Sequence, residues 1–145
     1  MEKISSEDVR KEVLRFWEIL SGKRADKLDD LYAPTAIAFT GKAKRGESAK
    51  LMAVRRARQL PGPDSGSSAE LGSIDVQLVG PDVAIAAYTY SFTTYKTKSD
   101  GSKVQLNTPF GRATQIFRRG EDGALRIVHE HLSAAAPPSQ EKSSE

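Results

Sequence analysis

Apolar residues repeat at helical spacing over the first part of the chain. Ser5 or Ser6 supplies an N-cap, and Glu7 and Asp8 follow in the first turn, where carboxylates suit the helix dipole. Spacings of three and four residues predict an amphipathic helix that ends near Gly22. Its apolar face consists of Val9, Val13, Phe16, Trp17 and Leu20.

Two more helices and a short strand are predicted in the next part of the chain. The second helix covers about Ala25 to Tyr32, and it ends at Ala33 because Pro34 disfavours helical geometry in the residue before it. Residues 37–39 read as a short strand. The third helix is predicted for about residues 46–60, where Leu51, Met52 and Val54 supply the apolar contribution.

The apolar period then changes from 3.6 to 2, after a loop that prolines, glycines and serines predict for residues 61–68. Alternation of this kind is typical of strands, and dipeptides such as Asp100-Gly101 are typical of tight hairpin turns. Strands are predicted for residues 71–78, 83–95, 110–118 and 125–133, separated by turns at 80–82, 98–101 and 121–123.

Helices first and strands afterwards predict an α+β fold, with the helices packed on one face of an antiparallel meander. Long antiparallel strands curl strongly, and helices that close one end of such a sheet leave a cone-shaped cavity. We expect one domain over residues 1–136. The stretch 137–145 contains proline and charged residues and is expected to be a disordered tail.

Composition agrees with one ordinary globular domain. The chain has 145 residues, of which 38% are hydrophobic and 28% charged. No apolar run approaches the roughly 18 residues of a membrane-spanning helix, the N-terminus lacks the apolar region of a signal peptide, and cysteine is absent. These features favour a cytoplasmic protein with no membrane partner.

The net charge of +3 is mild, and the excess of bases lies in residues 42–58. Such a run could attract an anionic partner, whereas a solvated helix face and loop are the simpler interpretation. Residues 41–69 contain no aromatic side chain on which bases could stack, so a nucleic-acid partner is not expected.

Both histidines flank one glutamate in the predicted last strand. Alternation places His129 and His131 on one face and Glu130 on the other. A general acid–base role in the cone is one hypothesis for Glu130 or His131, since imidazole titrates near neutral pH. The alternative is imidazoles packed in the sheet or in a dimer face. A metal site would need a third ligand, and no candidate occurs at a spacing typical of metal-binding motifs, so no metal is expected.

Aromatic residues provide the other candidates. Tyr88, Tyr90 and Phe92 share one strand face, and the tyrosine hydroxyls could bind a ligand oxygen or carry protons; a core or interface lining is the alternative. Trp17 and Tyr32 are expected on the two helices that floor the cavity, where core packing is again the alternative.

A group of aspartates on the second predicted helix is a weaker candidate. One of these carboxylates could supply a base near the cavity mouth, whereas a solvated helix face is the simpler interpretation. The group consists of Asp26, Asp29 and Asp30.

Several segments resemble SnoaL-like and related nuclear-transport-factor-2-like proteins: Arg15-Phe16-Trp17, Leu31 to Pro34, and Ile127 to Ser133. Within that superfamily the chain resembles the association domain of calcium/calmodulin-dependent protein kinase, in Val76 to Asp82, Ala87-Tyr88, Thr114 to Arg119, and Ile127 to His131 followed by Ser133-Ala134. The resemblance implies a curved sheet wrapped by helices, as in cystatin-like folds, with a cavity in the cone. It also implies dimerisation through the exposed sheet face, with further assembly into rings.

Two positions depart from the association domain. Its pocket arginines correspond here to Gln115 and Leu132, so its anion-binding chemistry is not carried over. Arg112 is a possible substitute, but a shift of three residues along a strand turns its side chain to the other face. The candidate ligand-binding residues are Trp17, Tyr32, Tyr90, Arg112 and Gln115.

Two functions remain open. The first is a non-catalytic module that binds a small molecule, associates with itself, or does both. The second is a cofactor-free isomerase, cyclase or hydratase that acts on an apolar oxygenated substrate through Tyr88, Glu130 or His131. Neither needs a cofactor, and the chain contains neither a Gly-rich phosphate loop nor a Gly-x-Ser-x-Gly motif.

Overall fold

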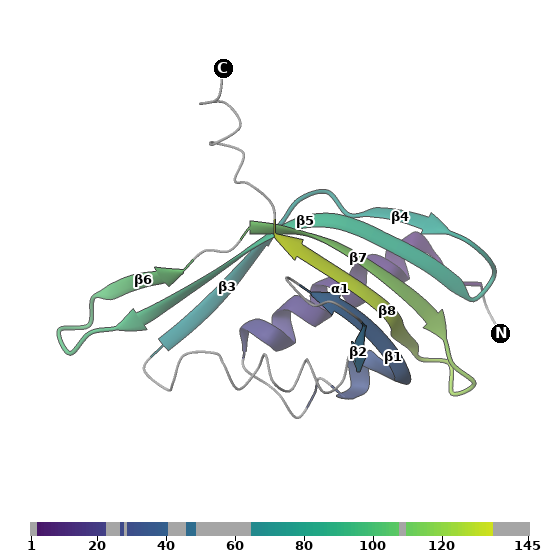
Figure 1. Cartoon of the computed structure of the whole chain (residues 1–145), viewed down its shortest axis with the longest axis horizontal. Coiled ribbons are helices and arrows are strands. Elements are labelled where there is room, and N and C mark those ends of the chain that lie inside the picture. Colours follow the sequence, from purple (N-terminus) through teal and green to yellow (C-terminus); the bar gives the residue numbers. More distant parts are fainter. Residues whose placement is uncertain are drawn as a thin grey trace, which may run out of the picture.

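The computed structural model describes residues 3–22, 27, 29–40, 46–48, 65–107 and 110–134 (Figure 1). These residues form an α+β fold, as predicted. The helices are α1 (Ser6–Ser21) and the 3₁₀ helix η1 (Asp29–Leu31). The strands are β1 (Tyr32–Thr40), β2 (Glu47–Ser48), β3 (Ser65–Leu71), β4 (Asp75–Leu78), β5 (Val83–Thr97), β6 (Lys103–Asn107), β7 (Phe110–Arg119) and β8 (Leu125–Ala134).

Helix α1 has the predicted caps. The Ser5 hydroxyl accepts a hydrogen bond from the Asp8 backbone N–H at 3.1 Å, and the Asp8 carboxylate accepts one from the Ser5 N–H at 3.2 Å, which together form a capping box. At the other end the Gly22 N–H donates to the Glu18 carbonyl. The apolar face of α1 is buried, as its spacing predicted.

The strands form one sheet in the order β2-β1-β8-β7-β5-β3, with β4 and β6 also paired to β5. The sheet is mixed, because β1 runs parallel to β8, whereas the other pairs are antiparallel. The expectation of a purely antiparallel meander was therefore wrong. No hairpin joins β1 to β8, so nothing local in the sequence fixes their relative direction.

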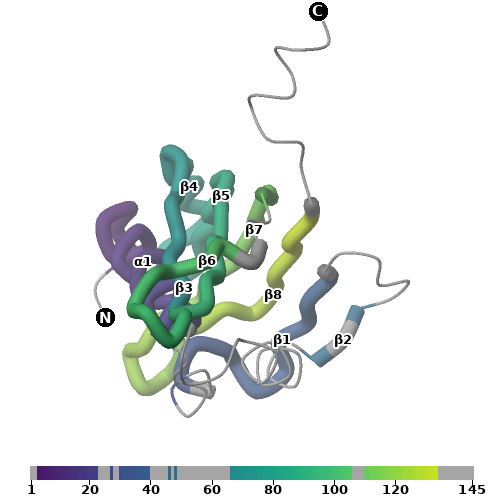
Figure 2. Tube along the Cα trace, turned by 90° about the vertical axis from the view of Figure 1, so that its left-hand side faces the viewer, coloured from purple at the N-terminus to yellow at the C-terminus, as the bar shows by residue number. Residues whose placement is uncertain are grey.

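The sheet curves around α1, which lies on its concave side (Figures 1 and 2). We call the side that faces α1 the inner face and the opposite side the outer face. Helix α1 contacts β3, β4 and β5, and its buried residues join inward residues of the sheet in one apolar core. In the described part of the chain, no helix combines the length and the apolar character needed to cross a membrane.

The second and third predicted helices differ from the structure. Tyr32 is the first residue of β1 and not part of a helix, and Pro34 lies within the same strand. The missing Pro34 N–H costs no regular ladder bond, because the pairing of β1 with β8 is irregular between Tyr32 and Ile37. Of the predicted third helix, Glu47–Ser48 is strand β2, and residues 49–60 lie outside the described residues.

Strand β3 begins within the predicted loop. Residues 65–68 pair with residues 93–96 of β5, so cross-strand hydrogen bonds override the turn propensity of this Ser- and Gly-rich stretch. The predicted strands over β5, β7 and β8 and the turns between them are confirmed.

A β-bulge in β8 decides which side chains face the core. Ile116 pairs with His129 and Phe117 pairs with Ile127, so Val128 is the extra residue on β8. The bulge changes the alternation, and both Ile127 and Glu130 are fully buried at the inner face.

Candidate functional site

Two neighbouring strands place polar side chains on the inner face of the sheet. Gln115 on β7 pairs with Glu130 on β8, and Ala38 and Ala86 flank this pair on the adjacent strands. Alanine side chains are short, so the two long polar side chains have room to lie across the sheet. Both Gln115 and Glu130 have 0% exposed surface.

These residues belong to a continuous hydrogen-bonded chain, which we call the polar chain: Trp17, Tyr88, Gln115, Glu130 and Tyr32. The Trp17 indole N–H donates to the Tyr88 hydroxyl at 2.9 Å, and that hydroxyl donates to the Gln115 Oε1 at 2.7 Å. The Gln115 Nε2 donates to the Glu130 Oε1 at 2.7 Å. The Tyr32 hydroxyl lies 3.2 and 3.0 Å from the two Glu130 oxygens.

The donors and acceptors of the polar chain run in one direction toward Glu130. The Tyr88 hydroxyl accepts a hydrogen bond from Trp17 and donates one to the Gln115 Oε1. The Gln115 amide in turn donates a hydrogen bond to the Glu130 carboxylate. A carboxylate only accepts hydrogen bonds, so every donor along the polar chain can point toward it. No described residue forms an ion pair with Glu130, so hydrogen bonds from Tyr32 and Gln115 stabilise this buried acid.

An aromatic wall continues from the polar chain along β5. The Trp17 ring lies 4.6 Å from Tyr90 and 5.9 Å from Phe92, measured between ring centroids. Glycine is required at position 111, because a Cβ there would lie 2.5 Å from the Tyr90 hydroxyl oxygen. Tyr88, Tyr90 and Phe92 thus share the inner face, as strand alternation predicted.

The histidines lie on the outer face. His131 is exposed and His129 is half-buried, and both rings lie beside Phe39, at centroid distances of 6.4 and 6.3 Å. The structure therefore does not bring His131 together with Glu130. Arg112 is also exposed on the outer face, opposite in orientation to Gln115, as its odd spacing predicted.

The aspartate group is only partly described. Asp30 is exposed in η1, whereas Asp26 and the side chain of Asp29 lie outside the described residues. Within the described residues, no three side chains of the His, Cys, Asp and Glu types are placed to hold a metal ion.

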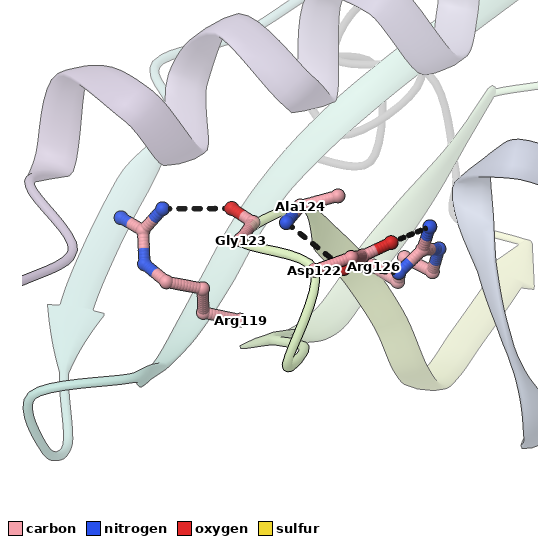
Figure 3. A network of polar contacts seen from close by, with 5 residues as sticks. All are labelled: Arg119, Asp122, Gly123, Ala124 and Arg126. Atoms are coloured by element: carbon pink, nitrogen blue, oxygen red, sulfur yellow. Dashed lines mark hydrogen bonds and ion pairs between the residues drawn. The ribbon is translucent and has the colours of Figure 1, made fainter. Parts of the chain in front are cut away.

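Sequence reasoning missed a charged network at the turn between β7 and β8 (Figure 3). Asp122 accepts from Arg126 at 2.6 and 3.0 Å, and Arg119 donates to the Gly123 carbonyl at 2.9 Å. The hydrogen bonds from Arg126 and from the Ala124 N–H lower the pKa of Asp122 to about 2. The turn itself was predicted, but nothing in the sequence indicated which charges it gathers.

The polar chain has a definite chemical capacity. Its tyrosine hydroxyls and the carboxylate can hold a hydrogen-bonding group of a ligand or pass a proton along the chain. Glu130 is covered by its partners, so a ligand would reach it through Tyr32, Tyr88 or Gln115, or by displacing one of them.

The fold is shared with many solved structures. A protein assigned as a calcium/calmodulin-dependent protein kinase II association domain, from Xanthomonas campestris, is 19% identical with a TM-score of 0.69, over 93% of this chain and 95% of that one. A nuclear-transport-factor-2-like superfamily protein from Salmonella enterica is 16% identical with a TM-score of 0.68, over 91% and 92%. A protein assigned as a scytalone dehydratase, from Novosphingobium aromaticivorans, is 11% identical with a TM-score of 0.72, over 90% and 83%.

These identities are low, so the structural neighbours establish the fold alone. A search of curated proteins gave no match. The sequence itself matches the SnoaL-like domain over residues 9–137, which is most of the chain. The resemblance seen in the helix α1 and β8 segments is thereby confirmed, and the chain belongs to the SnoaL-like domain family.

Proposed function

We propose that this domain is a self-associating, small-molecule-binding module, in which the outer face of the sheet joins two copies and the inner face receives the ligand. The observation that carries the proposal is the apolar outer face. Ile37 is 48% exposed there, beside the half-buried Phe39, Ile85 and Ile116. Helix α1 lies on the opposite side of the sheet (Figure 2).

A second copy of the chain is the occupant that fits this face. The apolar residues lie on β1, β7 and β5, and His129 of β8 lies between Ile37 and Ile116 in the same row, so the face suits face-to-face packing of two sheets. The similarity to a protein assigned as an association domain supports the same interpretation. Rings of dimers are a further possibility that the same measurements would detect.

The inner face supports the ligand-binding half of the proposal. It combines an aromatic wall with a few fixed hydrogen-bonding groups, which is the usual composition of small-molecule pockets. Tyr90 is half-buried at the end of that wall, and Tyr88 and Trp17 belong to the polar chain. An apolar ligand that carries an oxygen or a hydrogen-bond donor suits this lining.

Sedimentation velocity at micromolar concentration tests self-association. We expect a dimer for the wild type and a monomer for Ile37→Glu, because a charge on an apolar interface is strongly unfavourable. Leu14→Glu is the matched control, since Leu14 is similarly exposed (54%) but lies on α1. The proposal fails if the wild type sediments as a monomer, or if both variants dissociate equally.

A second candidate is a cofactor-free acid–base enzyme. It is favoured by one observation: Glu130 is a fully buried carboxylate for which no described residue supplies an ionic partner. The similarity to a protein assigned as a scytalone dehydratase agrees with this chemistry. In this alternative Glu130 moves the proton and Tyr88 polarises the substrate oxygen.

Turnover on a panel of oxygenated cyclic substrates tests the enzyme candidate. Glu130→Gln is expected to abolish any turnover that the wild type shows, whereas Thr114→Val, on the outer face, should leave it unchanged. Full activity of folded Glu130→Gln on an identified substrate would exclude Glu130 as the acid–base residue.

A further inference from the structure

A cleft of about 460 Å³ lies away from the polar chain, where the first half of α1 meets η1 and the β7–β8 turn. No member of the polar chain lines it. Its lining is rich in charged side chains of both signs, with one more base than acid: Lys11, Arg15, Arg119 and Arg126 against Asp8, Glu12 and Asp30.

Arg119 is the unusual member of this lining. Its Nη1 donates to the Gly123 carbonyl, whereas its Nε is buried and has no hydrogen-bond partner, the only such side-chain atom among the described residues. Its Nη2 lies 3.9 Å from the Asp8 carboxylate, which is beyond hydrogen-bonding distance. The Nε–Nη2 edge of a guanidinium is a fork that matches the two oxygens of a carboxylate or phosphate group.

The neighbouring charges are already engaged elsewhere. Arg126 makes two hydrogen bonds to Asp122, and Arg15 pairs with Glu12 at 3.3 Å. The Asp8 carboxylate accepts the Ser5 N–H in the α1 capping box, and its hydrogen bonds with Ser5 are the main cause of its lowered pKa.

Lys11 adds a second positive charge on the same side of α1. It lines the same cleft and lies three residues after Asp8, the acid that approaches Arg119, so the two side chains are neighbours on the helix surface. An anion on the Arg119 fork would therefore also be attracted by the Lys11 charge, while Asp8 keeps its capping role.

We propose that this cleft binds an oxyanion, the carboxylate or phosphate group of a small ligand, on the Nε–Nη2 edge of Arg119. Lys11 supplies the second charge. Asp8, Glu12 and Asp30 repel an anion, so the affinity for the bare ion is low and decreases with added salt. The remaining binding energy comes from the rest of the ligand. Arg119 lines the cleft and 16% of its side chain is exposed. Because its Nε is buried, the guanidinium must turn toward the cleft for both atoms of this edge to reach the anion.

Titration of the full chain with inorganic phosphate and, separately, with acetate tests the proposal, with backbone amide shifts as the readout. We expect saturable shifts centred on Gly123 and Ala124, and the ion that binds more tightly identifies phosphate or carboxylate as the ligand group. Arg119→Gln should weaken binding by about tenfold or more, because it removes charge-assisted hydrogen bonds. Asp8→Asn should strengthen binding, because it removes the nearest competing charge.

Arg118→Gln is the matched control. It makes the same change of charge at the adjacent position, where the side chain is exposed on the outer face, and it should leave the affinity unchanged. Arg119→Lys keeps the charge but removes the fork, and it should also weaken binding. It is the test variant if Arg119→Gln does not fold. Absence of saturable shifts, or an equal loss in Arg118→Gln, would overturn the proposal.

Discussion

Neighbouring residues of β8 lie in different environments on the two faces of the sheet. Glu130 points inward, has no exposed surface and accepts hydrogen bonds from Tyr32 and Gln115, whereas His131 points outward and is exposed beside Phe39. On the inner face the members of the polar chain have defined partners. On the outer face water, or a second copy of the chain, can satisfy the same kinds of group.

This difference determines what each residue can contribute. Removing one partner of a buried hydrogen bond leaves the other partner unsatisfied, which lowers the free energy of unfolding markedly. Replacing an exposed polar group changes that free energy little. Inner-face substitutions should therefore affect the free energy of unfolding. Outer-face substitutions should affect association and leave the fold intact.

The largest expected effect is that of Gln115→Leu. It leaves the Tyr88 hydroxyl without its acceptor and removes a donor from Glu130, so we expect a loss of about 3 kcal/mol or more in the free energy of unfolding. Thr114→Val, one residue earlier and exposed on the outer face, should change stability by less than about 0.5 kcal/mol. Urea unfolding measures both, and equal effects would show that the two faces do not differ in this way.

A smaller loss is expected for Tyr32→Phe. The ring stays in place, but Glu130 loses the hydroxyl that reaches both of its oxygens, at a cost of about 1–3 kcal/mol. Tyr95→Phe is the control, because the described contact of Tyr95 is between its ring and Lys103, 5.2 Å from the ring centroid, and does not use the hydroxyl. Identical unfolding midpoints for Tyr32→Phe and the wild type would contradict the assigned hydrogen bonds.

The smallest effect belongs to the solvent-exposed Asp122 at the β7–β8 turn. Its folded-state pKa of about 2 is below the ordinary value of 3.8, so its pairing with Arg126 stabilises the protein above about pH 4 and is lost as the pH falls through 2. Asp122→Asn should therefore flatten the dependence of the melting temperature on pH between about 4 and 2. Added salt should reduce the difference, and parallel pH curves for the two proteins would argue against the pairing.

Much of the fold follows from local sequence signals. The boundaries of α1 follow from its caps and apolar spacing, and the hairpin between β5 and β6 follows from Asp100-Gly101. The direction of β1 relative to β8 does not follow from local signals, because the two strands are far apart in the sequence. The strand that runs through Pro34 was missed for the same reason: irregular pairing with β8, and not local propensity, makes it acceptable.

The site was predictable only in part. Strand alternation correctly separated Glu130 from the histidines and Gln115 from Arg112. The continuous hydrogen bonding through Gln115 was not predictable, because it depends on distances between side chains of four strands and a helix. The bulge at Val128, which turns Glu130 toward the same side as Ile127, has no signature in the sequence.

The parallel pairing of β1 with β8 also orders events in time. The Tyr32–Glu130 hydrogen bond joins residues separated by 98 positions, so it closes only after nearly the whole domain has left the ribosome. Contacts this distant in sequence slow folding, because a long loop must close before they form. Until β8 arrives, the edge of β1 opposite to β2 is unpaired in the nascent chain, and we expect its pairing with β8 to be the late step that commits the domain to its native state.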